Sequence, residues 1–215
     1  MISIAQVVDE LIRKTPSLET ALASDIINYS SLARNLKPQI EKRLLKEIKE
    51  GAIVMALKRV SSKLKDTLPK TEEILKMLGD ITIRSNLVDY TFLSSPTLGI
   101  AQNTIIEKTK DRKDVFMTIT HGISQITIVA SQSLEDDIKE IFKNETPICT
   151  LENLSSLTIK IPLEATKMPG VLYSILKLLA WEGISLTEMI STFTELSIVL
   201  DTKDIERAFS LLKNP

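Results

Sequence analysis

The chain has very few of the residues that build covalent or metal-bound frameworks. Its 215 residues include one cysteine and one histidine. The single cysteine, Cys149, excludes an internal disulfide framework and fits a reducing compartment, so we expect a cytoplasmic protein. One histidine and one cysteine cannot supply a metal site of the common His/Cys type. We therefore expect neither a metal nor a cofactor.

Long apolar runs are also missing. No run approaches the ~18–20 residues needed to cross a bilayer, and the first six residues contain no basic region that leads into an apolar stretch. We therefore expect no membrane association and no secretory signal. The apolar share of 43% is nevertheless compatible with a packed core.

Groups that could perform catalysis do not converge in the sequence. There is no glycine-rich phosphate loop, and His121 lies at the tip of an expected turn before Gly122. Cys149 lies among apolar residues of an expected strand, which favours a core thiol over a nucleophile. We expect a protein that is not an enzyme.

Charge divides the chain into two parts. Residues 1–70 carry a net charge of +5, from 13 basic and 8 acidic residues, whereas residues 71–215 carry −6, from 14 and 20. This asymmetry indicates two units with different surroundings. Apolar residues at helical spacing predict that residues 1–70 form a helical domain, with residues 71–79 as a connector. The expected helices span residues 4–12, 18–26, 38–48 and 53–64, and Ser30 is an expected N-cap.

Two pieces of the helical domain, residues 29–34 and 51–60, resemble the scaffold and second helix of a helix-turn-helix unit. In that interpretation a set of basic and hydroxyl side chains would contact DNA phosphates. These are Lys58, Arg59, Lys63 and Lys65, with Ser61 and Ser62. The favoured interpretation is a solvated helix face, because the segment between the pieces exceeds the ~3–4-residue turn of the motif. Nucleic-acid binding is therefore possible but not favoured.

The second part of the chain repeats one pattern of elements. Residues 87–151 predict the order β-α-β-β-α-β, and residues 157–213 predict β-α-β-β-α. The second copy lacks its last strand, whereas residues 81–84 form a spare strand before the first copy. We expect this spare strand to complete the second sheet, so that the copies interleave.

The turn residues of this duplicated region resemble those of a known module. They are Met168-Pro-Gly-Val171, the segment 181–186, the segment 188–192, and the entering strand 81–85. They resemble the ACT domain, and most closely the paired ACT domains at the C-terminus of aspartate kinase, over residues 80–213. The resemblance implies two interleaved ferredoxin-like βαββαβ (ACT) domains over residues 80–152 and 153–215. With the preceding helical domain, which has no counterpart in the family, the expected fold class is α+β. The resemblance also implies allosteric regulation, amino-acid binding and a homodimer joined at sheet edges, while the kinase portion is absent.

Two loops deliver the chain into helix N-termini, where unpaired N–H groups receive carboxylates. The resemblance implies that an amino acid lies against such a loop and the beginning of the second strand. In the first copy the expected ligand-binding residues are Ser94, Ser95, Thr97 and Leu98, with Asp114, Val115 and Phe116 opposite them. In the second copy they are Met168, Gly170 and Val171, with Ser185, Leu186 and Thr187.

The expected ammonium partners differ between the copies. Asp114 could pair with the ligand ammonium in the first copy, whereas the second copy has no acid at Ser185 and would need Glu164 or a partner subunit. The first copy also has Pro96-Thr97 where the family has a Pro-Gly step. The alternative for both loops is a capped turn that binds no ligand.

Three functions remain open. The leading hypothesis is a non-catalytic regulatory protein that responds to an amino acid through its paired ACT domains. A second is a ligand-responsive transcription regulator with residues 1–70 on DNA. A third is a regulatory subunit of a separately encoded biosynthetic enzyme, with residues 1–70 as the docking module.

Overall fold

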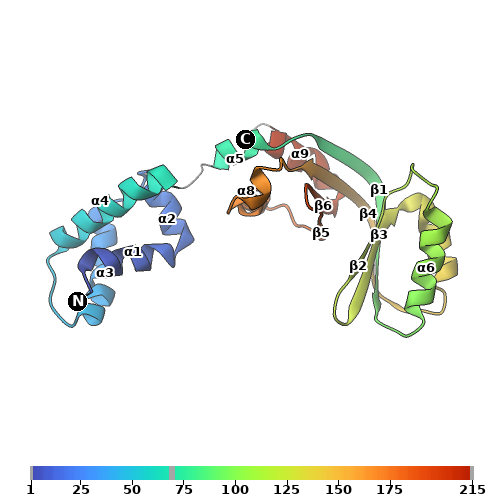
Figure 1. Ribbon diagram of the computed structural model, residues 1–215, viewed down its shortest axis with the longest axis horizontal. Helices are drawn as coiled ribbons and strands as arrows, with labels where there is room; N and C mark the ends of the chain where they lie inside the picture. Colours follow the sequence, from blue (N-terminus) through green and yellow to red (C-terminus); the bar gives the residue numbers. More distant parts are fainter. Residues whose placement is uncertain (1, 68–70, 214–215) are drawn as a thin grey trace. The chain divides into compact units, whose positions relative to one another are not determined.

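The computed structural model describes residues 2–67 and 71–213, which lie in two compact units, residues 1–70 and 71–215 (Figure 1). Within the described part of the chain, no helix is both long and apolar enough to cross a membrane.

The first unit is helical. It contains α1 (Ile4–Arg13), α2 (Pro16–Ala23), α3 (Tyr29–Leu44) and α4 (Glu50–Thr67). Ser3 begins α1 with a capping box: its hydroxyl accepts from the Gln6 N–H and the Gln6 side chain accepts from the Ser3 N–H. The apolar stripes of the four helices meet in one buried core. It includes Val8, Ile12, Leu22, Ala33, Ile40, Ile53, Leu57 and Leu64.

Two expectations for this unit were wrong. The third helix does not open at Pro38 but runs from Tyr29 through that proline as one element of 16 residues. Its N-cap is Asn28, whose Oδ1 accepts from the Ser31 N–H at 3.0 Å, and not Ser30. Asn and Ser are about equally good N-caps, and here Asn28 has the extended backbone that the position requires. The helix ends at Leu44, and its C-cap residue, Leu45, has a φ of 51°.

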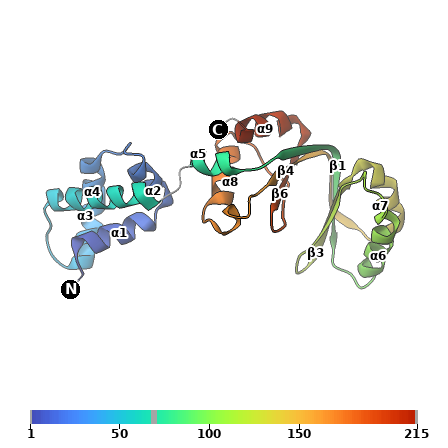
Figure 2. The same cartoon turned by 45° about the horizontal axis from the view of Figure 1, so that its top comes forward.

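The second unit is mixed. It contains α5 (Thr71–Met77), β1 (Ile81–Leu93), α6 (Leu98–Thr109), β2 (Met117–His121), β3 (Gln125–Ser131), α7 (Glu135–Ile141), β4 (Pro147–Lys160), α8 (Val171–Trp181), β5 (Glu188–Ser191), β6 (Glu195–Asp201) and α9 (Ile205–Lys213). The strands form one six-stranded sheet in the order β2-β3-β1-β4-β6-β5 (Figures 1 and 2). Every neighbouring pair in it is antiparallel. The predicted fold class, a helical domain followed by two interleaved ferredoxin-like copies, is confirmed.

Strands β1 and β4 are each shared by both copies. The sequence predicted two separate strands in each place, but each runs on as one strand through a bulge. Asn86 in β1 and Asn153 in β4 both have a φ of 58°, a conformation that asparagine tolerates better than most residues. Before its bulge, β1 pairs with the second copy: Ile81 lies opposite Ile159. After its bulge, β1 pairs with β3 of the first copy.

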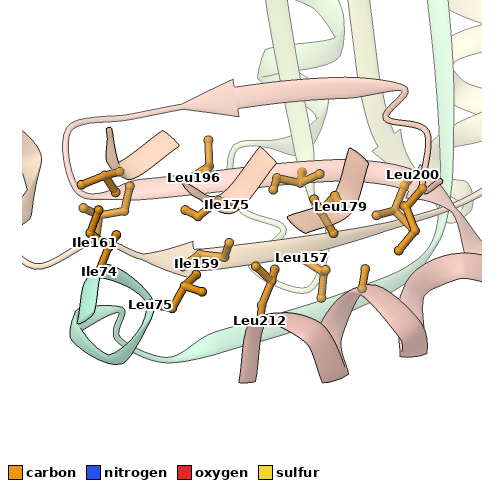
Figure 3. Close-up of a cluster of buried hydrophobic side chains, with 14 of the residues drawn as sticks. Ile74, Leu75, Leu157, Ile159, Ile161, Ile175, Leu179, Leu196, Leu200 and Leu212 are labelled. Atoms are coloured by element: carbon orange, nitrogen blue, oxygen red, sulfur yellow. The ribbon is translucent and has the colours of Figure 1, made fainter. Parts of the chain in front are cut away.

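Each half of the sheet has its helices on one face. In the second half, α5, α8 and α9 cover a core that contains Ile74, Leu75, Leu157, Ile159, Ile175, Leu179, Leu196, Leu200 and Leu212 (Figure 3). In the first half, α6 and α7 cover a core that contains Val88, Tyr90, Phe92, Leu98, Ile105, Ile128 and Ile138. Because side chains alternate along a strand, the residues between these core positions point to the opposite face.

β4 ends at Lys160, so Leu163 lies beyond the strand and is exposed. α8 begins at Val171, after an N-cap at Gly170. One local expectation in this unit was wrong. Cys149 was expected in the core, but it is exposed because that part of β4 is the edge of the first half of the sheet.

Candidate functional site

The loop that precedes α6 lies beside the β2–β3 hairpin of the first copy. Leu93, the last residue of β1, pairs with Gln125, and the Ser94 N–H donates to the Ser124 carbonyl at 3.0 Å. The other half of the predicted site lies at the opposite end of the sheet. There the Phe116 carbonyl accepts from the N–H of Ser131, the residue that pairs with Leu87. Leu87 and Leu93 are six residues apart along β1, so the two ends are separated by about 20 Å at the usual rise per residue of a strand.

The predicted first-copy residues therefore form two separate groups within one chain. Ser94, Ser95, Thr97 and Leu98 lie together at one end, and Asp114, Val115 and Phe116 at the other. The carboxylate of Asp114 accepts a hydrogen bond from Arg112 Nη2 at 3.0 Å. This bond lowers the pKa of Asp114. Asp114 thus already has a cationic partner in its own turn.

The first-copy loop holds a carboxylate from the same chain. Ser95 Oγ donates to Glu145 Oε2 at 2.8 Å, and Thr97 Oγ1 donates to Glu145 Oε1 at 2.6 Å. Ser95 Oγ also accepts from the Leu98 N–H at 3.2 Å. Bonds to an ionised carboxylate are stronger than neutral ones. The side chain of Glu145 therefore occupies the position that an external carboxylate would need.

The corresponding loop of the second copy borders a cavity of about 440 Å³. The cavity lies between the loop, the start of α8 and the β5–β6 hairpin. It is lined by Ile161, Ala165, Thr166, Lys167, Met168, Gly170, Val171, Leu172, Tyr173, Ser191, Thr192 and Phe193. Gly170 is the N-cap, with a φ of 92°, and no side chain caps the helix. The first N–H groups of α8 therefore lack both helical and side-chain partners.

The structure brings only part of the predicted second-copy site to this cavity. Met168, Gly170 and Val171 line it. Ser185, Leu186 and Thr187 lie beyond the other end of α8, where the Thr187 N–H donates to the Val199 carbonyl at 2.8 Å. The four residues of β5 separate that end from the hairpin by about 13 Å. The hairpin residues 191–193 line the cavity instead.

The order of elements could have indicated this arrangement. In a βαββ unit the first and second strands run parallel, with the third strand between them. The loop after the first strand and the hairpin after the second therefore lie at the same end of the sheet, and the start of the second strand lies at the far end.

The charge of the cavity lining is positive. Lys167 is the one charged side chain among the lining residues, all of which the structure describes, and it is exposed to solvent. Glu164, the expected alternative partner for a ligand ammonium, is exposed on the same loop but does not line the cavity. Lys167 and the positive end of α8 together favour an anionic group at this point.

The side chains that could bind a metal ion lie apart in the described part of the chain. Among residues 2–67 and 71–213, no three His, Cys, Asp or Glu side chains come close enough to hold a metal ion. His121 Nε2 lies 3.0 Å from the side-chain nitrogen of Gln102.

Known proteins resemble this chain in structure alone. No protein-family profile and no curated protein sequence matches it. A solved structure of the regulatory subunit of aspartate kinase from Thermus thermophilus, in a ligand-free form, matches with a TM-score of 0.52 and 10% identity, over 64% of this chain and 97% of that one. Residues 71–213 have the paired-ACT fold.

Two further structures agree with this assignment. The "aspartokinase alpha and beta subunits" match with a TM-score of 0.52 and 14% identity, over 63% of this chain and 95% of the other. Aspartate kinase from Clostridium acetobutylicum matches with a TM-score of 0.52 and 17% identity, over 64% of this chain and 34% of the enzyme. At these identities the likeness establishes the fold.

Proposed function

We propose that this chain is a cytoplasmic, non-catalytic regulatory protein that binds a small effector, an amino acid, through its second ACT copy. The observation that carries the proposal is the cavity at the uncapped start of α8. The first copy is less suited to an effector, because Glu145 already occupies its loop.

The cavity suits the two ends of an amino acid differently. The effector carboxylate would accept from the first N–H groups of α8 and pair with Lys167. Its side chain would contact the apolar part of the lining, which includes Ile161, Met168 and Phe193. The lining offers the ammonium no carboxylate, so this group would bind backbone carbonyl oxygens or an acid from a second chain.

A second chain would also account for the predicted residues that lie far from the cavity. Ser185, Leu186 and Thr187 lie about 13 Å along β5 from the hairpin, so they could contact an effector in the cavity of a partner subunit. Residues 147–153 of β4 pair with β1 on one side only, which leaves an edge that another chain could extend. Binding between subunits would let the effector favour one arrangement of the dimer over another.

The proposal is tested by thermal shift and calorimetry of the full chain with each of the common L-amino acids at millimolar concentration. We expect at least one amino acid to raise the melting temperature. We expect Lys167→Ala to weaken the binding of that amino acid about two- to fivefold, which corresponds to the loss of one exposed charge contact. Lys113→Ala removes an exposed lysine from the first copy and should not change binding. If none of the amino acids shifts the melting temperature, the proposal fails.

A surface groove on the helical unit favours the docking-module hypothesis as a second candidate. The groove, of about 490 Å³, is lined in part by Ile2, Met55, Lys46 and Arg59. Ile2 and Met55 are exposed, and apolar surface rimmed by cations suits an acidic, amphipathic segment of a partner enzyme. Co-purification from the native cell tests it. Met55→Glu should abolish capture of that enzyme, whereas Met77→Glu on α5 should not.

The DNA-binding alternative is less well supported. Ser61, one of its expected phosphate contacts, is buried: its hydroxyl donates to the Leu22 carbonyl at 2.9 Å and accepts from the Tyr29 hydroxyl at 2.9 Å. The piece 29–34 is the beginning of a long helix and not a separate scaffold helix. Salt-dependent binding to duplex DNA that weakens in Lys58→Ala would revive this alternative.

A further inference from the structure

The helix-free faces of the two copies lie on the same side of the shared sheet. Val88 and Tyr90 of β1 point into the core under α6 and α7, so Leu87 and Asp89 point the other way. In β6, Ile198 and Leu200 point into the second core, so Val199 points away from it. Leu87 pairs directly with Leu154, which places the two helix-free faces next to each other.

An approximate two-fold relation links these faces. Two matching rows of three residues cross them, one in each copy. The rows are Asp89–Val129–Thr118 in the first copy and Ser156–Val199–Glu188 in the second. The bulges at Asn86 and Asn153 stand in equivalent places, and bulges bend a sheet.

Apolar side chains join the two helix-free faces. One buried cluster contains a residue from each of the four central strands: Leu87 of β1, Val129 of β3, Leu154 of β4 and Val199 of β6. Phe116, which precedes β2, and Ile190 of β5 pack against it from the two copies. We call this cluster and the polar residues of the two rows the joint.

Asp89 is the fully buried acidic residue of the joint. It is 2% exposed, and its carboxylate receives one hydrogen bond within the described residues, from Thr91 Oγ1 at 3.3 Å. A buried carboxylate needs more partners than one long bond to remain ionised at low cost. Burial, and next the charge of Glu188, raise the pKa of Asp89 to about 6. Burial also raises the pKa of the half-buried Glu188.

The approximate two-fold axis places a second polar pair in the joint. Asp89 and Glu188 come from the first and last positions of the two rows, and the equivalent pair is Ser156 and Thr118. Ser156 Oγ and Thr118 Oγ1 are both buried with no hydrogen-bond partner among the described residues. One side of the joint therefore holds two carboxyl groups, and the other holds two unpaired hydroxyls.

Within the described part of the chain, the side chains that act on the Asp89 carboxyl are Glu188 and Thr91, and neither is a cation. The neighbours of Asp89 on the adjacent strands are Val129 and Leu151, and Cys149 lies opposite Thr91, two residues further along β1. Arg84 lies on the same face, where it pairs with Ser156 and so extends the second row at the end opposite Glu188. Three strand spacings separate Arg84 from Glu188, a distance of about 14 Å. Glu188 of β5 is the group whose charge acts on Asp89.

We propose that the joint between the two copies is a proton-operated hinge, which closes when the buried Asp89 carboxyl is protonated and loosens when Asp89 and Glu188 are both ionised. One proton is taken up from solvent on closing, which removes the buried charge of Asp89 and its repulsion by Glu188. Two ionised carboxylates in a buried joint repel each other and are poorly solvated. The hinge would make the relative position of the two copies depend on pH, independently of any effector.

Hydrogen exchange of the full chain at several pH values tests the hinge. We follow amides in residues 115–117 and 188–191, which flank the joint from the two copies, and compare wild type with Asp89→Asn at each pH so that intrinsic exchange cancels. We expect the variant to be about tenfold better protected at pH 8 and the two proteins to be equal within about twofold near pH 5.

A second variant and a control complete the test. Glu188→Gln removes the repulsion but keeps Asp89, so it should also increase protection at pH 8, and it serves if Asp89→Asn does not fold. Glu195→Gln neutralises an exposed carboxylate at the start of β6, and its exchange should follow wild type at every pH. Equal protection of wild type, Asp89→Asn and Glu188→Gln at pH 8 would overturn the hinge.

Discussion

Thr97 Oγ1 lies 2.6 Å from Oε1 of Glu145, across 48 residues of sequence. This contact ties the loop before α6 to the turn before β4, and it distinguishes the two copies of the fold. The equivalent loop before α8 has no such carboxylate, and a cavity opens there instead. Duplication of a fold has therefore produced one filled and one open loop.

Removing the internal carboxylate should both destabilise the chain and open the first copy. Glu145→Ala breaks two charge-assisted bonds, from Ser95 and Thr97, so we expect a loss of about 1–3 kcal/mol in the free energy of unfolding. Urea unfolding measures this loss. Glu140→Ala, an exposed change on the neighbouring α7, should cost less than about 0.5 kcal/mol. Equal stability of the two variants would show that the contact contributes nothing.

The same variant probes ligand binding. If the first loop can accept an external carboxylate once Glu145 is gone, calorimetry with the effector found for the second copy should show about two sites per chain in place of one. An unchanged stoichiometry would mean that the first loop is structural even when it is empty.

Substitution of buried residues in the shared strand β4 should destabilise the second core. Leu157 is fully buried, whereas its register partner Ile83 is 40% exposed. Leu157→Ala should lower the free energy of unfolding by about 2–5 kcal/mol, from lost burial and the cavity left behind. Ile83→Ala should cost about 1 kcal/mol or less. Urea denaturation of both variants checks the difference, and similar losses would contradict the placement of Leu157.

Asp89 should make the chain less stable as pH rises. Its pKa is about 6 in the folded protein, above the ~3.9 of an exposed aspartate. The folded state therefore binds the proton more tightly, and the free energy of unfolding should fall as pH rises from about 4 through about 6. The upper limit is about 3 kcal/mol, from two pKa units at 1.36 kcal/mol each. Asp89→Asn should remove this fall, so chemical unfolding between pH 4.5 and 8 should show a gain over wild type that grows with pH.

The duplicated pattern was predictable because its physical causes are local. Alternating apolar residues such as Leu157 and Ile159 give a strand with one buried face. The second copy lacked its last strand, and residues 81–84 formed a spare strand. Pairing the spare strand with the second copy was therefore the simplest way to complete both sheets. The structure pairs Ile81 with Ile159, in agreement with the interleaved fold.

The site was less predictable because it depends on contacts between distant segments. Nothing in the sequence near Ser95 or Thr97 indicates that Glu145 lies between them, since the turn before β4 approaches this loop only in the folded sheet. The exposure of Cys149 has a similar cause: the apolar residues around it suggested a core strand, but that stretch of β4 has a neighbour on one side only.

Residues 147–153 of β4, which pair with β1 on one side only, should be where two chains meet. Ile148 and Leu151 are 47% and 40% exposed on it, and an exposed edge with apolar side chains readily pairs with another strand. Leu151→Lys places a positive charge on this edge. In a symmetric pairing the two introduced lysines would lie near each other and repel, so we expect the dissociation constant of the dimer to rise at least about tenfold. Sedimentation velocity over a concentration series measures this change. Thr120→Lys places the same charge on β2, the edge strand at the other side of the first copy, and should leave the dimer intact. Dissociation by Thr120→Lys and not by Leu151→Lys would assign the interface to β2 instead.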